Sequence, residues 1–396
     1  VPPNTRDFSR EIQAAQQTPV WYNIAMRTYK YRLYPTSEQT ARLENTLEAC
    51  RSLYNAALAE RKCAYRQQRK HISKLQQLNE LPDMKGSIPE LQRVHSQVLQ
   101  DVVIRVDKAF DAFFRRLGSG DRPGYPRFRG KGWYDSFTYP QSGFSLSENK
   151  CGNQKLRLSK IGKVRIRLHR PVEGKIKTCT IKRETDKWYV CFSCEVEPKP
   201  LPKSNKAAGV DMGLLSFAAL SDGSTISNPR YLRKAENKLK YEQRRLSKKR
   251  MKSNSRKKQK AKLARLHRKV ANQRKDFLHK KSRKLVNNYD TLVFEDLRVK
   301  NMVKNHHLAK SISDASWGRF IQYCTYKAEN AGKQVILVNP RGTSQICSKC
   351  GAVVKKTLAM RIHKCECGLK IDRDVNAAIN ILGLGTGLGG ASALAG

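Results

Sequence analysis

Residues 207–223 read AAGVDMGLLSFAALSDG, and they place a charged residue, Asp211, within the mainly apolar run 207–220. The stretch predicts a buried strand followed by a hairpin, because a short apolar run bounded by turn residues is typical of buried strands. Burying an unpaired carboxylate is costly. Asp211 therefore calls for a functional explanation.

Two further acidic residues have similar surroundings. Glu295 ends a strand-like segment over residues 290–297 (DTLVFEDL), and Asp374 lies in IDRDVNAAINIL. On a helix, Asp374 shares one face with Ala377, Ala378 and Ile381. Asp296 and Asp372 are interpreted as turn or helix-cap residues.

Three separated carboxylates on two strands and a helix are what a two-metal phosphodiester site requires. In such a site two Mg²⁺ ions about 4 Å apart stabilise the attacking and leaving oxygens of an in-line displacement. We expect Asp211 and Asp374 to share one ion while Glu295 helps hold the second. Water would attack the phosphorus and the 3′-oxygen would leave.

Four of the eleven cysteines form a C-terminal cluster that reads CSKCG, a spacer, then CECG. Two close pairs, each followed by a glycine, predict one structural Zn²⁺ bound by Cys347, Cys350, Cys365 and Cys367. His363 could replace one thiolate, although this is the weaker alternative. Four protein ligands leave no open position for a reactive water, so this site is predicted to do no chemistry.

The other cysteines are scattered. Cys191 and Cys194 have CxxC spacing, but they lie in the strand-like WYVCFSCEVE, where residues three apart point to opposite faces. Buried thiols are therefore predicted there instead of a second metal site. An odd total also argues against a disulfide framework.

Charge excludes most other classes of protein. The 396 residues carry 79 Lys and Arg against 33 Asp and Glu, a net charge of +46. Such a chain repels itself unless a polyanion neutralises it, and DNA or RNA is favoured over an anionic membrane because the basic residues run through the whole chain. No apolar run reaches the roughly 18 residues of a membrane span, and no signal-peptide core is visible, so a cytoplasmic protein is predicted.

The pattern along the chain predicts an α+β multidomain protein. Residues 37–117 have helical periodicity, with a capping box from Thr36 to Gln39, and residues 136–196 alternate as an antiparallel barrel or sheet. The Pro-rich EPKPLPKSN (197–205) is predicted to be a domain boundary. Residues 231–285 are helical and very basic, which favours nucleic-acid contact over a solvated face. The loop GDRPGYPRFRGKG (120–132) suits phosphate contact and base stacking, or it is a solvated basic turn.

The sequence resembles the TnpB (OrfB) proteins of bacterial insertion sequences, which are relatives of the type V CRISPR effector nucleases. The resemblance runs from about Met26 to Leu382. It is carried by YRLYPTSEQ, GYPRFRGK, GVDMGLLSFAALSDG, VFEDLRVKNM, SWGRF…YKAENAGKQVILVNPRGTSQICSKCG and CECGLKIDRDVNAAINI.

The resemblance implies an RNA-guided DNA endonuclease. Its partners would be a transposon-derived guide RNA and double-stranded target DNA with a short adjacent motif, in a monomeric ribonucleoprotein. The family's catalytic acids fall on Asp211, Glu295 and Asp374, and its zinc cysteines on Cys347, Cys350, Cys365 and Cys367. A guide-dependent repressor that no longer cuts, and a strand-transferring transposase, are the alternatives. A tyrosine transposase is not supported, because His306 and His307 are adjacent instead of flanking a hydrophobic residue.

The resemblance also implies a domain layout, with an RNase H-like (RuvC) nuclease domain after a helical lobe and a wedge-like β domain. Met26 is the expected native start. The predicted layout is an N-terminal extension (1–25), a β-barrel, wedge-like domain (26–36 and 120–197), a helical recognition lobe (37–119), a linker (198–206), a RuvC-like nuclease domain (207–345) with a basic helical insertion (231–285), a zinc ribbon (346–368), a last RuvC helix (369–382) and a disordered tail (383–396).

Overall fold

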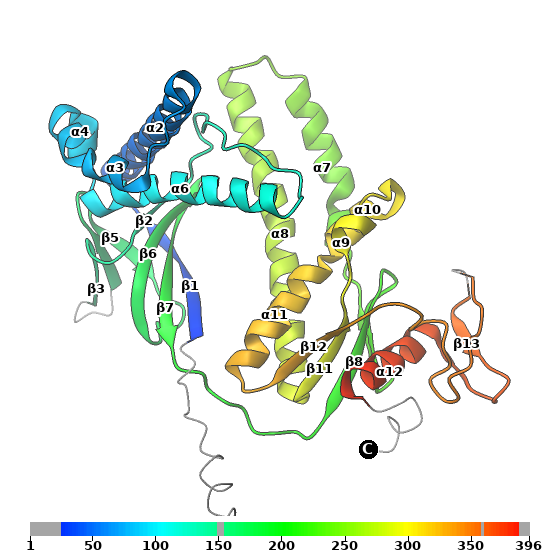
Figure 1. Ribbon diagram of the computed structural model, residues 1–396. Helices are drawn as coiled ribbons and strands as arrows, with labels where there is room; N and C mark the ends of the chain where they lie inside the picture. The colour runs from blue at the N-terminus through cyan, green and yellow to red at the C-terminus, as the bar shows by residue number, and fades with distance from the viewer. Residues whose placement is uncertain (1–24, 149–153, 358–359, 388–396) are drawn as a thin grey trace, which may run out of the picture. The chain divides into compact units, whose positions relative to one another are not determined.

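The computed structural model describes residues 25–148, 154–357 and 360–387. The chain divides into two compact units, residues 1–197 and 198–396 (Figure 1). Each is described by itself. Among the described residues, none of the helices is long and apolar enough to cross a membrane.

Unit 1 combines a helical group with a seven-stranded antiparallel sheet of order β2-β6-β7-β1-β5-β4-β3. Its elements are β1 (Ala25–Tyr34), α2 (Ser37–Gln68), α3 (Lys74–Asn79), α4 (Leu81–Ser87), α5 (Pro89–Gln92), α6 (Ser96–Gly118), β2 (Ser136–Tyr139), β3 (Phe144–Glu148), β4 (Gln154–Leu158), β5 (Gly162–Arg167), β6 (Lys175–Glu184) and β7 (Lys187–Val196).

The start of α2 confirms the predicted capping box. The Thr36 hydroxyl accepts a hydrogen bond from the Gln39 backbone N–H, and the Gln39 side chain accepts one from the Thr36 N–H. These two bonds satisfy backbone donors that the first turn of a helix leaves without partners. The sequence therefore fixes the point at which the strand β1 passes into the helix.

The sheet of unit 1 alternates as its sequence predicts. Every second residue of β7 is buried, so Cys194 lies in the core while Cys191 is half-buried on the other face. The two side chains therefore do not share a metal site. In the described residues β2 and β3 end the strand order. The predicted barrel or sheet is thus a sheet in which β2 and β3 are the edge strands and are not hydrogen-bonded to each other.

Unit 2 is built on a five-stranded mixed sheet of order β10-β9-β8-β11-β12. The strands β8, β11 and β12 are parallel, and β9 and β10 continue the sheet antiparallel. The elements are β8 (Ala207–Met212), β9 (Ser216–Leu220), β10 (Thr225–Ser227), α7 (Tyr231–Ser247), α8 (Asn254–Asn288), β11 (Thr291–Glu295), α9 (Val299–Met302), α10 (His306–Ala315), α11 (Trp317–Asn330), β12 (Gln334–Val338), β13 (Ile362–Lys364), β14 (Lys370–Asp372) and α12 (Arg373–Thr386).

Helices cover both faces of this sheet (Figure 1). Phe294 of β11 packs on one side with residues of α8 and α11, such as Leu278 and Phe320. Its neighbour Val293 packs on the other side with Ile381 of α12. Because successive strand residues point to opposite faces, a strand buried on both faces reads as a continuous apolar run. This explains why LVF precedes Glu295 without a polar residue between.

The helix α12 lies directly against β8. A side chain at Gly209 would bring its Cβ to 2.0 Å from the Ala378 carbonyl oxygen, and one at Gly385 would lie 2.4 Å from Val293 Cγ1. Glycines at these positions allow the helix and sheet backbones to approach closely. The contact fixes the position of the first turn of α12, which carries Asp374.

Three predicted boundaries are wrong. The last helix begins at Arg373 instead of 369, because residues 370–372 form β14, which pairs with β13. It continues to Thr386, so residues 383–386 of the predicted tail are helical, whereas residues 388–396 lie outside the described part. The basic helical segment ends at Asn288 instead of 285. Residues 1–24 of the predicted extension also lie outside the described residues.

Candidate active site and metal centre

The three predicted carboxylates meet at one edge of the sheet of unit 2. Val210 of β8 pairs in register with Phe294 of β11, so Asp211 and Glu295 follow at the ends of two adjacent parallel strands. Adjacent strands lie about 4.8 Å apart. Asp374 comes from the first turn of α12, and its Oδ2 lies 3.9 Å from the position of a Cβ at Gly213, just beyond β8. Two strand ends and one helix start therefore bring together residues that are far apart in the sequence.

Asp211 is in the least favourable environment for a charged carboxylate of the three, because it is the one whose pKa both other carboxylates raise. Burial, followed by the charges of Glu295 and Asp374, raises the pKa of Asp211 to about 8, against a smaller lowering effect of Arg373. Burial also raises the pKa of Glu295 and of Asp374. A cluster of half-buried carboxylates with too little positive charge nearby is a strained arrangement. A bound cation would reduce the repulsion between these carboxylates and stabilise their charged forms.

Three hydrogen bonds orient the cluster, and the first of them was not predicted from the sequence. The Thr343 hydroxyl donates to Glu295 Oε1 at 2.6 Å, and Thr343 is itself buried. Asp372 caps α12 by accepting from the backbone N–H groups of Asp374 (2.8 Å) and Val375 (3.2 Å). The cap role of Asp372 confirms its interpretation from the sequence. Thr343 lies in the Gly-Thr-Ser stretch before the cysteine cluster, and nothing in that pattern indicates its partner.

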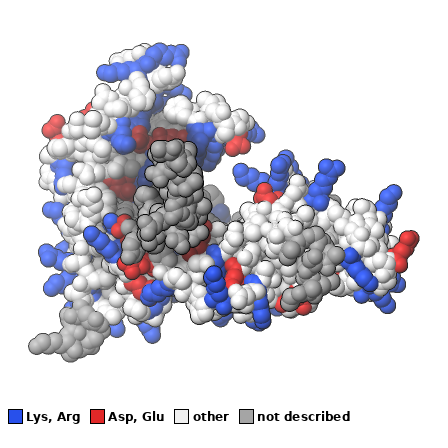
Figure 2. Space-filling model, turned by 60° about the horizontal axis from the view of Figure 1, so that its bottom comes forward, with Lys and Arg blue, Asp and Glu red and all other residues white. Residues whose placement is uncertain are grey.

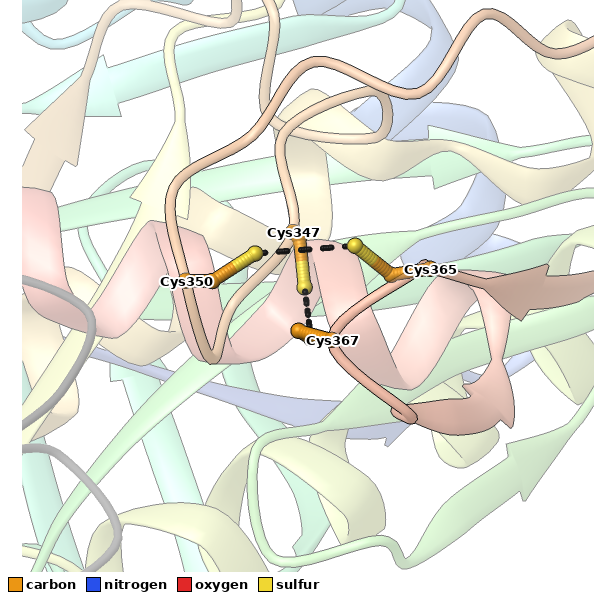
Figure 3. Close-up of side chains that lie close together, drawn as sticks. All are labelled: Cys347, Cys350, Cys365 and Cys367. Carbon is orange, nitrogen blue, oxygen red and sulfur yellow. Dashed lines mark hydrogen bonds between the residues drawn. The ribbon is translucent and has the colours of Figure 1, made fainter.

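The four predicted cysteines converge at a second site (Figure 3). Their sulfur atoms all lie within 4.8 Å of one another, and the pairs Cys347–Cys367 and Cys350–Cys365 are 3.6 and 3.5 Å apart. A tetrahedral Zn²⁺ with bonds of about 2.3 Å separates its sulfur ligands by about 3.8 Å. The spacing therefore fits one zinc ion. Within residues 25–148, 154–357 and 360–387, this is the one group of three or more acidic, cysteine or histidine side chains close enough to hold a single metal ion.

The local backbone explains how the pairs form. Each pair ends in a glycine with positive φ, Gly351 at 78° and Gly368 at 86°, which lets the chain turn back beneath the thiols. Burial alone would raise the pKa of Cys347, but hydrogen bonds from backbone N–H groups and from His363 lower it to about 6. A thiolate at Cys347 is ready for a metal. At Cys365 the Cys367 backbone N–H lowers the pKa of the thiol, but burial and the neighbouring thiols together raise it to about 12.

His363 is a neighbour of the four thiols and not a member of the group. It is fully buried, and its Nδ1 contacts the ammonium of Lys356, which also donates to the Ser344 carbonyl oxygen at 2.8 Å. A ligand set of four cysteines is therefore favoured over the alternative that includes His363.

Comparison with solved structures shows which class of fold the chain has. The chain has the fold of the Cas12 effectors: it aligns with a Cas12f1–sgRNA–target DNA complex over 91% of this chain and 99% of that one, with a TM-score of 0.57 and 14% identity. It aligns with the mini-RNA-guided endonuclease Cas_phi3 over 93% and 92%, with a TM-score of 0.50 and 10% identity.

Comparison of sequences then gives the family. A Streptomyces pristinaespiralis protein named "Putative RNA-guided DNA endonuclease" is 37% identical over 91% of this chain and 89% of its own length. "Putative RNA-guided DNA endonuclease InsQ" of Escherichia coli K12 is 33% identical over 91% and 92%. The chain belongs to the TnpB (OrfB) family.

Family matches cover three segments. Residues 191–306 match the OrfB family described as "Probable transposase", residues 317–381 match the Cas12f1-like TNB domain, and residues 26–70 match a domain described as helix-turn-helix. The structure of residues 26–70 is β1 followed by α2, so this segment has a single long helix after a strand.

Proposed function

We propose that this protein is a transposon-associated, RNA-guided DNA endonuclease that cuts with a RuvC-like site in unit 2. The catalytic residues are Asp211, Glu295 and Asp374. The observation that carries the proposal is the convergence of these carboxylates from β8, β11 and α12, with the pKa of Asp211 raised to about 8. The family membership and the names of the relatives support the reaction class.

The residues of the cluster fit divalent metal ions. Carboxylate oxygens are the hard ligands that Mg²⁺ prefers. The three carboxylates do not gather as tightly as ligands of one ion, which suits two ions about 4 Å apart. Such ions, when bound, would activate water and stabilise the leaving 3′-oxygen. Asp211 would contribute the central carboxylate, Asp374 would be presented by the capped helix start, and Glu295 would be oriented by Thr343.

Two basic surfaces support nucleic acid as the partner. Figure 2 shows Lys and Arg spread over the face in view, with fewer acidic side chains among them. In unit 2, α7 and α8 form a basic hairpin whose arms are joined through buried Glu242, which accepts hydrogen bonds from Gln259 (2.6 Å) and Lys262 (2.8 Å). The hairpin carries many more Lys and Arg than Asp and Glu, and this excess of positive charge suits contact with phosphates.

In unit 1 the loop 120–133 is anchored along α2. The Asn55 side-chain amide donates to the Arg129 carbonyl oxygen (3.0 Å) and accepts from the Arg129 N–H (2.7 Å). The anchored loop leaves Phe128 51% exposed and Trp133 76% exposed beside several arginines. Exposed aromatic rings among cationic side chains suit stacking with unpaired bases. These surfaces would hold a guide RNA and its DNA target in a monomeric ribonucleoprotein, with a short DNA motif read beside the target.

Two experiments test the proposal. First, the protein is purified from cells that carry its flanking DNA, and the bound nucleic acid is sequenced; a discrete RNA ending at the transposon boundary is expected. Second, that RNA is used in cleavage assays with Asp211→Ala, Glu295→Ala and Asp374→Ala. Each variant should lose cleavage and retain target binding, while the control Asp276→Ala, at an exposed position on α8, cuts as the unmodified protein does. Retained cleavage by Asp211→Ala would show that the site is wrongly assigned.

A further inference from the structure

Two buried asparagines connect α12 to the turn that carries the first zinc cysteines. Asn376 and Asn380 are four residues apart and so lie on one face of the helix. Asn376 accepts from the Ser348 N–H at 3.0 Å and donates to the Ile346 carbonyl oxygen at 2.8 Å. Asn380 donates to the same carbonyl at 2.7 Å. The backbone on both sides of Cys347 is therefore bonded to the helix that presents Asp374.

The same asparagines reach the segment that orients Glu295. Asn380 also donates to the Thr343 carbonyl oxygen at 2.8 Å, and the Thr343 hydroxyl donates to Glu295 Oε1 at 2.6 Å. The Pro340 carbonyl oxygen is a second possible acceptor, but it lies 3.4 Å from the same hydroxyl. The Thr343 hydroxyl therefore donates mainly to the carboxylate of Glu295. A continuous set of hydrogen bonds thus leads from the cysteine turn to a carboxylate of the proposed active site.

Burial shows that these contacts exclude water. Asn376 is fully buried and Asn380 is 9% exposed, while Thr343 is 3% exposed. An apolar residue of similar size would leave the Ser348 N–H and the Ile346 carbonyl oxygen buried without these partners, which is costly. The two amide side chains are the exceptions on this helix, because its other buried residues are valine, alanine, isoleucine, leucine and glycine.

We propose that Thr343, Asn376 and Asn380 are positioning residues that make the geometry of the carboxylate cluster depend on the metal-loaded zinc ribbon. This inference rests on the proposed function, because it takes Glu295 and Asp374 as ligands of the catalytic ions. Thr343 holds one oxygen of Glu295 and leaves the other to the metal. Asn376 and Asn380 fix the position of the cysteine turn relative to α12 through their hydrogen bonds to its backbone. Loss of zinc would then disturb the active site through these bonds, although the zinc ion takes no part in cleavage.

The Thr343 hydroxyl is tested with a pair of variants. Thr343→Val removes the hydroxyl at nearly constant volume, and Thr343→Ser keeps it. Neighbours that orient a metal ligand typically change metal affinity or activity by 10–100-fold when removed. Thr343→Val should raise the Mg²⁺ concentration for half-maximal cleavage by about this factor, with target binding unchanged, and Thr343→Ser should restore it. The control is Thr325→Val on α11, whose hydroxyl donates only to the Ile321 carbonyl oxygen within its own helix.

The asparagines are tested with a readout that does not depend on cleavage. Zinc release to a coloured chelator should be faster in Asn376→Leu and Asn380→Leu than in the unmodified protein, and the rise in melting temperature caused by Mg²⁺ should shrink in the same variants. Thr343→Val should show the smaller Mg²⁺ effect with normal zinc release. If Asn376→Leu does not fold, Asn380→Leu and Thr343→Val still decide the question.

The outcomes separate this inference from the proposed function. If Thr343→Val responds to Mg²⁺ as the unmodified protein does, or if loss of the asparagines changes zinc release without changing the response to Mg²⁺, the coupling is refuted and the nuclease assignment stands. If the unmodified protein shows no cleavage with its guide, the proposed function fails, and the thermal response to Mg²⁺ still shows whether the hydrogen bonds couple the two sites.

Discussion

Replacing Asp211 with asparagine is expected to stabilise the metal-free protein. The surroundings raise the pKa of Asp211 to about 8 from an ordinary value of 3.8, first through burial and then through Glu295 and Asp374. At pH 7 the folded protein keeps this proton and the unfolded chain has released it. The proton uptake on folding costs about 4 kcal/mol at 1.36 kcal/mol per pH unit.

Relaxation of the half-buried site lowers this figure, so a gain of about 2–4 kcal/mol is expected for Asp211→Asn at pH 7. For a unit of this size, it corresponds to an increase in melting temperature of about 5–15 °C. The measurement is thermal unfolding in a chelator of Mg²⁺ that spares zinc. The matched control is Asp276→Asn on α8, where an exposed pair with Lys280 is lost and the change should stay below about 0.5 kcal/mol.

The stability difference between Asp211→Asn and the unmodified protein should depend on pH in a defined direction. A carboxyl whose pKa is raised on folding binds more protons in the native state, so its contribution to stability falls as pH rises from about 4 to about 8. The advantage of Asp211→Asn should therefore be near zero at pH 4, grow up to pH 8 and then level off. Mg²⁺ should reverse the order, because it stabilises only the protein that binds it. An advantage that does not change with pH, or a variant less stable at pH 7, would refute the electrostatic account of the site.

Three further predictions concern packing, zinc and nucleic acid. Gly209→Ala places a Cβ 2.0 Å from the Ala378 carbonyl oxygen and should destabilise unit 2 by about 3 kcal/mol in denaturant unfolding, whereas an unchanged midpoint would show that α12 can move away. Cys350→Ser should abolish stoichiometric zinc in elemental analysis and lower the apparent stability of unit 2 by about 4 kcal/mol or more, and full zinc content would contradict the four-cysteine site. Phe128→Ala should weaken binding of single-stranded oligonucleotides by about 1–3 kcal/mol with little change in its salt dependence, whereas an effect confined to the salt slope would indicate phosphate contact instead of stacking.

Local signals predicted the parts of the fold that depend on neighbouring residues. The capping box at Thr36 and Gln39 and the alternation around Cys194 are both present in the structure. Each depends on backbone donors and side-chain faces within a few positions of the chain. For the same reason Asp372 could be interpreted as a helix cap from its place before the helical pattern.

Long-range contacts could not be read from the sequence in the same way. The start of α12 was placed too early because the short strand β14 gains its pairing from β13 and has no strong pattern of its own. Thr343 looks like an ordinary loop residue until β11 and its Glu295 are placed beside it. The asparagines of α12 interrupt an apolar helix face, which marks them as unusual, but only the fold shows that they bind the cysteine turn.

The close contact between β8 and α12 has a consequence for synthesis on the ribosome. The strand β8 with Asp211 is made before the helix α12 with Asp374, and the basic hairpin α7–α8 is made between them. Until α12 is complete, one face of the sheet has no cover and the carboxylate cluster lacks a member. A nascent chain can thus expose cationic surface to RNA before the proposed catalytic cluster is complete. Under the proposed function, this order of elements delays cleavage until α12 has been made.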